Sequence, residues 1–124
     1  MPEYPVKITV QTHYLAEQSR PAKEQYAFAY HITIHNSSER TVTLLTRHWL
    51  ITDSDGNLQE VKGEGVVGQK PTLKPGESFD YSSGAVLKTP VSTMEGSYGM
   101  VTQSGTPFSV PIPPFLLAVP GTIN

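Results

Sequence analysis

The sequence contains no cysteine among its 124 residues. Without thiols the chain can form neither a disulfide framework nor a thiolate metal site, and a cysteine nucleophile is excluded. Long hydrophobic runs are also missing, because the longest one, at residues 115–119, is far too short to span a bilayer. Residues 1–7 lack the basic and then apolar pattern of a signal peptide. We therefore expect a cytoplasmic protein with no membrane partner.

An excess of charge of either sign is lacking as well. The formal net charge is −2, and 16% of the residues are charged, so nothing in the composition points to a nucleic-acid partner. A chain of this length can bury one core, so residues 1–124 are expected to form a single domain. Ten glycines and eleven prolines separate its β-branched and aromatic runs. This composition favours many short strands joined by turns.

The apolar residues alternate with a period of two. In the clearest run, Tyr26, Phe28, Tyr30, Ile32 and Ile34 alternate with smaller or polar residues, which is typical of a half-buried strand. Further strands are predicted at residues 6–10, 42–52, 58–62, 79–87, 96–101 and 108–112. The run at 42–52 carries apolar residues on both faces, which indicates a central strand. Residues 16–24 are polar and contain a proline, so we predict a loop there.

Seven or eight strands without a convincing amphipathic helix predict an all-β protein. The expected architecture is an antiparallel two-sheet sandwich of the fibronectin type III or immunoglobulin kind. The last strand contains Pro111 and Pro113, and proline confines a strand to a sheet edge or an extended path. This apolar C-terminal segment is expected either to cover the sandwich or to serve self-association, so a homodimer is one candidate assembly.

The most distinctive motif is Gly63-x-Gly65-x-x-Gly68. This glycine spacing is typical of a dinucleotide-binding loop, which needs a strand before it and a helix after it. Because Pro71 and Pro75 exclude the helix, a Rossmann site is excluded too. Three interpretations stay open. The glycines serve a bend between strands, or they let another protein's backbone approach, or their amides form an anion nest. The nest would comprise Gly63, Gly65 and Gly68 with Lys62 and Lys70.

No catalytic or metal-binding residues are predicted. Asp53 and Glu64 have the spacing of the first and last EF-hand ligands, but Leu58 occupies the required glycine position, so a hairpin turn is favoured. His31 and His35 would lie about 13 Å apart along a strand, too far to share one ion. The serines lack the nucleophile-elbow pattern. We therefore expect a non-enzymatic protein without a cofactor.

Several phrases of the chain together resemble the ApaG family. The phrases are Asn36, the run around Arg47-His48-Trp49, the glycine motif, and then Pro75-Gly76, Phe79-Asp80-Tyr81 and Thr89-Pro90, and the likeness covers roughly residues 6–115. The resemblance implies a fibronectin type III-like sandwich and an association with cobalt and magnesium tolerance, without a settled activity. In relatives of this kind the glycine loop is considered for pyrophosphate binding.

Two functions are therefore expected. The first is a non-enzymatic interaction module with an unidentified protein partner, which would use a sandwich edge or the face of the glycine loop. The alternative is a protein that binds a phosphate-containing small anion, pyrophosphate or a dinucleoside polyphosphate, through the glycine loop.

Overall fold

The computed structural model describes residues 5–121, which form eight strands and two short 3-10 helices. The strands are β1 (Val6–Tyr14), β2 (Tyr26–Asn36), β3 (Val42–Asp53), β4 (Leu58–Glu64), β5 (Thr72–Leu73), β6 (Ser78–Leu87), β7 (Val91–Thr102) and β8 (Pro107–Ala118). All strand pairs are antiparallel. The prediction of an all-β, two-sheet antiparallel sandwich is confirmed.

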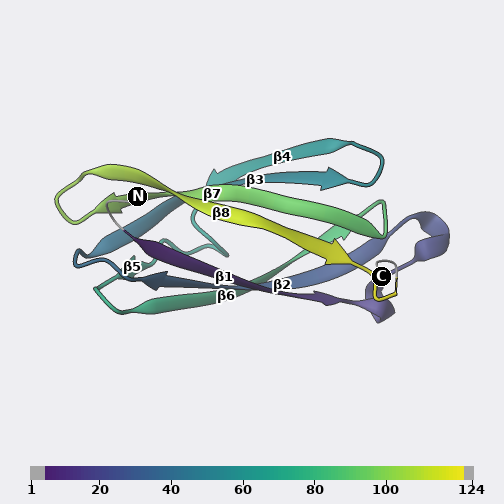
Figure 1. Cartoon of the computed structure of the whole chain (residues 1–124), viewed down its shortest axis with the longest axis horizontal. Helices are drawn as coiled ribbons and strands as arrows, with labels where there is room; N and C mark the ends of the chain where they lie inside the picture. The colour runs from purple at the N-terminus through teal and green to yellow at the C-terminus, as the bar shows by residue number, and fades with distance from the viewer. Residues whose placement is uncertain (1–4, 122–124) are drawn as a thin grey trace.

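The two sheets form two layers that run along the length of the molecule (Figure 1). One sheet has the order β1-β2-β6, and the other has the order β4-β3-β7-β8 with β5 beside β3. On one side of the sandwich the edge strands β1 and β8 contact each other. On the other side lie the edge strands β4 and β6. We call this second side the open side.

The alternation predicted for β2 sets the core. Phe28, Ile32 and Ile34 are almost completely buried, and Tyr30 is buried as well. The facing layer contributes buried side chains from β3, β7 and β8, among them Leu44, Trp49, Met94, Tyr98, Met100, Val110, Ile112 and Leu117. Burying one face of each sheet against the other is what stabilises a sandwich.

A β-bulge in β3 determines which side chains enter the space between the sheets. The pairing of β3 with β7 shifts between Leu44 and Thr46, so Leu45 is the extra residue and is partly exposed. Before the bulge the even-numbered Val42 and Leu44 point inward. After it the odd-numbered residues do, which is why Trp49 and Ile51 are buried. Arg47 belongs to this same inward series.

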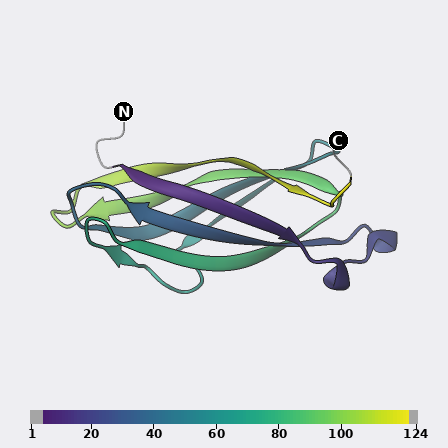
Figure 2. The ribbon, with the colours of Figure 1, turned by 60° about the horizontal axis from the view of Figure 1, so that its bottom comes forward.

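Two parts of the chain differ in detail from the sequence prediction. Residues 16–24, predicted to be a loop, contain two 3-10 helices, η1 (Ala16–Gln18) and η2 (Pro21–Lys23), beyond the ends of β1 and β2 (Figure 2). Proline at the start of η2 fits the first turn of a helix. β8 continues through its prolines to Ala118, because it is an edge strand with a second register shift opposite Met94 and Gly96.

A pair of tyrosine hydroxyls, Tyr81 on β6 and Tyr98 on β7, links the two sheets by a hydrogen bond. Burial raises the pKa of Tyr81 to about 12, although the hydrogen bond with Tyr98 acts in the opposite direction. Burial also raises the pKa of Tyr98, and the neighbouring Tyr81 raises it further. Both hydroxyls therefore stay neutral well above the pH at which an exposed tyrosine ionises.

We expect this pair to make the folded state sensitive to alkali. In the unfolded chain both phenols ionise near pH 10, whereas in the folded protein they hold their protons to higher pH, so stability is fully present below about pH 10 and is lost as the pH rises further. The variant Tyr98→Phe should lose less stability between about pH 9 and about pH 11 than the wild type. Urea unfolding at several pH values measures this slope, and equal slopes would contradict the assignment.

Candidate functional site

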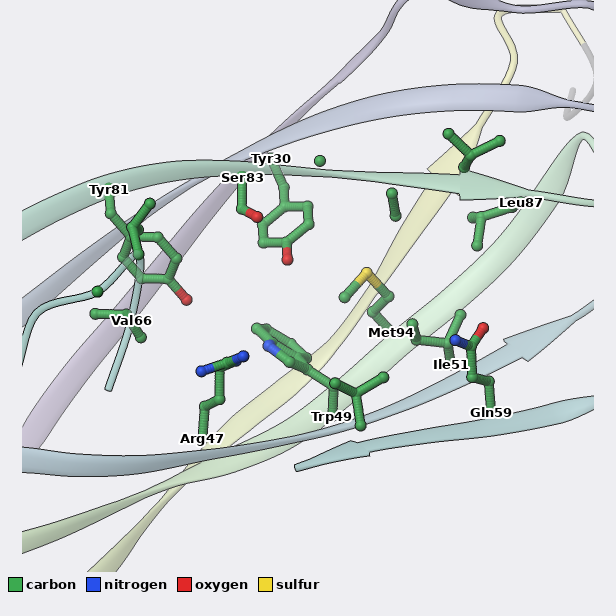
Figure 3. A pocket seen from close by; sticks show the side chains of 16 residues that line it. Tyr30, Arg47, Trp49, Ile51, Gln59, Val66, Tyr81, Ser83, Leu87 and Met94 are labelled. Carbon is green, nitrogen blue, oxygen red and sulfur yellow. The ribbon is translucent and has the colours of Figure 1, made fainter. Parts of the chain in front are cut away.

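A cavity of about 420 Å³ lies between the two sheets on the open side. Its walls come from β2, β3, β4, β6, β7 and the glycine loop (Figure 3). The residues that line it include Tyr30, Arg47, Trp49, Ile51, Val66, Tyr81, Ser83, Leu87 and Met94. We call this cavity the cleft. Its size is within the usual range of small-molecule sites.

The floor of the cleft is aromatic and carries unused polar atoms. Tyr30 and Trp49 face each other from opposite sheets, with ring centroids 5.8 Å apart in an edge-to-face arrangement. Figure 3 shows the Tyr30 hydroxyl pointing toward Trp49 inside the cleft. Within residues 5–121, neither this hydroxyl nor the Trp49 indole N–H has a hydrogen-bond partner, and no fully buried polar side-chain atom is unpaired. Both groups are therefore accessible from the cleft, although the two residues are only 7% and 3% exposed.

Among the residues that line the cleft, Arg47 is the one that carries a charge. Its Nη1 donates to the backbone carbonyls of Glu64 (2.9 Å) and Gly65 (3.1 Å). Gly63 lies directly opposite Arg47 in the β3–β4 pairing, and a Cβ at Gly63 would be 2.7 Å from three guanidinium atoms. The absence of a side chain at Gly63 thus leaves the space that the guanidinium occupies.

The glycine loop is a tight hairpin. Val66 and Gln69 exchange both backbone hydrogen bonds, and Val67 and Gly68 between them have positive φ angles of 47° and 77°. A turn with two left-handed central residues suits a hairpin. At Gly65, where φ is +66°, a Cβ would come within 2.4 Å of the Gln69 carbonyl oxygen. The loop is anchored by Val66, which is 1% exposed and belongs to the core.

The structure shows what the predicted anion-nest residues contact. The amides of Gly65, Val66 and Gln69 already donate to backbone carbonyls of Leu45, Gln69 and Val66, respectively. Among residues 65–69, the amides of Val67 and Gly68 at the tip donate no backbone hydrogen bond within the described chain. Lys70 lies 3.2 Å from a Glu64 oxygen, and Lys62 lies 3.9 Å from a Glu60 oxygen. The carbonyls of Glu64 and Gly65 accept hydrogen bonds from Arg47, while Val66, Val67 and Gly68 line the cleft.

Three of the four histidines have local partners outside the cleft. His31 and His35 bond through Nδ1 to the hydroxyls of Ser82 and Ser78 across the β2–β6 pairing. His48 bonds to Glu60, and this hydrogen bond together with the charge of Lys62 lowers the pKa of the Glu60 carboxyl. Among residues 5–121, no three histidine, aspartate or glutamate side chains cluster in a way that could hold a metal ion.

Sequence reasoning identified the glycine loop but did not identify the cleft. From the sequence, Arg47 and Trp49 were noted only as parts of a motif of the ApaG resemblance, and Tyr30 was noted only as a strand residue. The sequence does contain one signal for the position of Arg47. After the Leu44-Leu45 doublet, Arg47 precedes Trp49 and Ile51 at intervals of two residues, so the three lie on one face of the strand. Read as a bulge, this doublet would have placed Arg47 on the inward face.

Comparisons with known proteins agree with the fold and with the family resemblance. The family model described as the ApaG domain matches residues 16–102. The chain is 53% identical over 123 residues to Protein ApaG of Pseudomonas fluorescens, which covers 99% of this chain and 98% of that protein. It is 54% identical over 122 residues to Protein ApaG of Thiobacillus denitrificans, covering 98% and 96%.

A solved relative has the same architecture. The crystal structure of an ApaA protein from Bordetella pertussis superimposes with a TM-score of 0.93 at 49% identity, covering 96% of this chain and 97% of that one. Over residues 5–121 of the present structure, no helix has the length and apolar character needed to cross a membrane. On the match of the domain model and of the full-length relatives, the chain belongs to the ApaG family.

Proposed function

We propose that the protein is a non-enzymatic interaction module that binds an extended segment of a partner protein along β6. The observation that carries this proposal is the uncovered edge of β6. Within residues 5–121 this strand pairs with β2 alone, whereas the β1 and β8 edges on the other side contact each other. A strand edge offers a row of backbone donors and acceptors to which an added strand can pair.

The composition of the open side favours β6 over β4 as the docking edge. β4 carries Glu60, Lys62 and Glu64, and charged side chains are the usual protection of an edge against pairing. β6 has ten residues, contains neither lysine nor proline, and has Asp80 as its one charged residue. The exposed apolar side chains Val86, Val67 and Leu58 border the same side, at 66%, 61% and 64% exposure. An apolar partner segment would cover them.

The test uses one apolar position on each side of the sandwich. We expect Val86→Lys on β6 to abolish capture of the partner from an extract of the source cells, because the lysine places a charge in the apolar contact. Its stability should change by no more than about 0.5 kcal/mol, as is usual for an exposed position. Leu116→Lys is the matched control, since Leu116 is 50% exposed on β8 at the opposite edge.

Amide hydrogen exchange of the captured complex gives the second readout. Strand addition should protect backbone amides of β6 while leaving those at the outer edge of β8 unchanged. Capture that survives Val86→Lys, or a complex without protection on β6, would contradict the proposed function.

A further inference from the structure

The cleft contains a cation without an anion. Arg47 is always charged, yet the ion pairs found among residues 5–121 involve other side chains. Its nearest loop carboxylate, Glu64, is paired with Lys70. Two carbonyls occupy Nη1, which leaves the N–H groups of Nε and Nη2 without acceptors among residues 5–121. A partly buried charge of this kind is stabilised when an anion accepts its remaining hydrogen bonds.

The other polar groups of the cleft complete a set of donors. The Trp49 indole can only donate, the Tyr30 hydroxyl can donate, and both are more than nine-tenths buried and unpartnered. The Ser83 hydroxyl lies on the same wall, because Ser83 pairs directly with Tyr30 in the β2–β6 register. The rest of the lining includes Ile51, Leu87 and Met94, which are buried and apolar.

We propose that the cleft binds a carboxylate attached to an apolar or aromatic body. The Nε and Nη2 edge of Arg47 forms a planar fork that matches the two oxygens of a carboxylate. The Tyr30 hydroxyl and the Trp49 N–H would donate to the same oxygens. The apolar body would lie against the aromatic floor and the side chains of Ile51, Leu87 and Met94. This site does not depend on the partner segment proposed for β6.

The charge of the site favours a carboxylate over a polyphosphate. A single guanidinium balances one negative charge, and the remaining donors are neutral. Pyrophosphate carries more charge than this, and the lysines nearest to the loop are paired with Glu60 and Glu64. In this arrangement the glycine loop acts on the ligand indirectly, because its carbonyls and the space above Gly63 fix the position of Arg47.

Trp49 makes the test direct, because it is the single tryptophan of the chain. Its indole N–H gives one resonance in a two-dimensional ¹H–¹⁵N spectrum and reports on the cleft alone. We expect phenylacetate to shift this resonance in a saturable way. Phenylacetamide, which has the same shape without the charge, should bind at least about tenfold more weakly. Pyrophosphate should leave the resonance unshifted at the same concentration.

Variants assign the effect to named groups. Tyr30→Phe keeps the ring and removes the hydroxyl, so the affinity for phenylacetate should fall about tenfold, whereas Tyr14→Phe on β1 should leave it unchanged. Arg47→Gln should abolish detectable binding. Gly63→Ala keeps the charge but displaces the guanidinium, so it should also weaken binding at least tenfold. Each variant is first checked for a native spectrum in β1, β7 and β8.

A peptide arm identifies the source of the carboxylate. An end-blocked peptide of alternating valine and threonine with one glutamate is compared with the same peptide carrying glutamine. Glutamate-dependent binding tighter than that of phenylacetate would assign the site to an acidic side chain of a protein, and weaker binding would assign it to a free organic acid. The proposal is overturned if phenylacetate and phenylacetamide bind alike, if neither carboxylate ligand shifts the indole resonance, or if pyrophosphate binds more tightly than both.

Discussion

Gly96→Ala should lower the free energy of unfolding by about 3 kcal/mol or more. Gly96 on β7 pairs with Trp49 on β3, and a Cβ at this position would be 1.9 Å from the His48 carbonyl oxygen and 3.1 Å from the Trp49 Cα. Both are backbone atoms of the central strand, so no side-chain rotation can relieve the contact. The two central strands of the larger sheet, β3 and β7, would have to separate beneath the cleft.

Urea unfolding followed by circular dichroism measures this effect. Gly84→Ala is the matched control. Gly84 lies on β6, an edge strand that can move, and its added methyl group would meet a single atom, the Phe28 carbonyl oxygen at 3.1 Å. Its loss of stability should be clearly smaller. Equal losses in the two variants would show that the close approach of β7 to β3 is not what requires a glycine at position 96.

Asn36→Asp should also remove about 3 kcal/mol or more of stability at neutral pH. Asn36 is fully buried where β2 ends, and its side chain makes four hydrogen bonds. The amide nitrogen donates to the carbonyls of Arg40 (2.7 Å) and Leu73 (2.9 Å), while the amide oxygen accepts from Ser38. An aspartate would place a carboxylate oxygen against two carbonyl oxygens, so the bonds that join the end of β2 to the β2–β3 turn and to β5 would be lost.

The same variant should show a defined dependence on pH. Burial and the two carbonyls disfavour the charged form, so the pKa of this introduced carboxyl is raised in the folded state. Its stability is then greatest below the unfolded pKa of about 3.9 and falls as the pH rises toward the folded pKa. Gln103→Glu, at an exposed position in the turn after β7, adds the same charge and should be nearly neutral. A loss of stability in Asn36→Asp that is independent of pH would contradict this explanation.

The strands could be predicted because their pattern is local. The alternation from Tyr26 to Ile34 persists over most of β2, and the apolar residues on both faces of residues 42–52 correctly indicated a central strand. Pro111 and Pro113 correctly indicated an edge strand, since β8 lies at the edge of its sheet. The short helices at residues 16–23 were not predicted, because three-residue 3-10 turns leave no periodic signal.

The cleft could not be predicted in the same way, because it depends on pairing between distant strands. The glycine motif is visible in the sequence, but its partner is Arg47, which precedes Gly63 by sixteen residues and meets it through the β3–β4 register. The inward direction of Arg47 depends on the bulge at Leu45, which is defined only by pairing with β7. A motif that is associated with phosphate binding elsewhere therefore serves here to position a cation.

The prolines of β8 have a consequence for assembly. Pro107 and Pro111 maintain their register with β7, so the N–H groups that they lack are missing from the outer rim of that sheet. The larger sheet therefore resists strand addition at its β8 border. If two copies join through β6 of the smaller sheet, the twofold contact uses the same border of both copies and closes at the dimer.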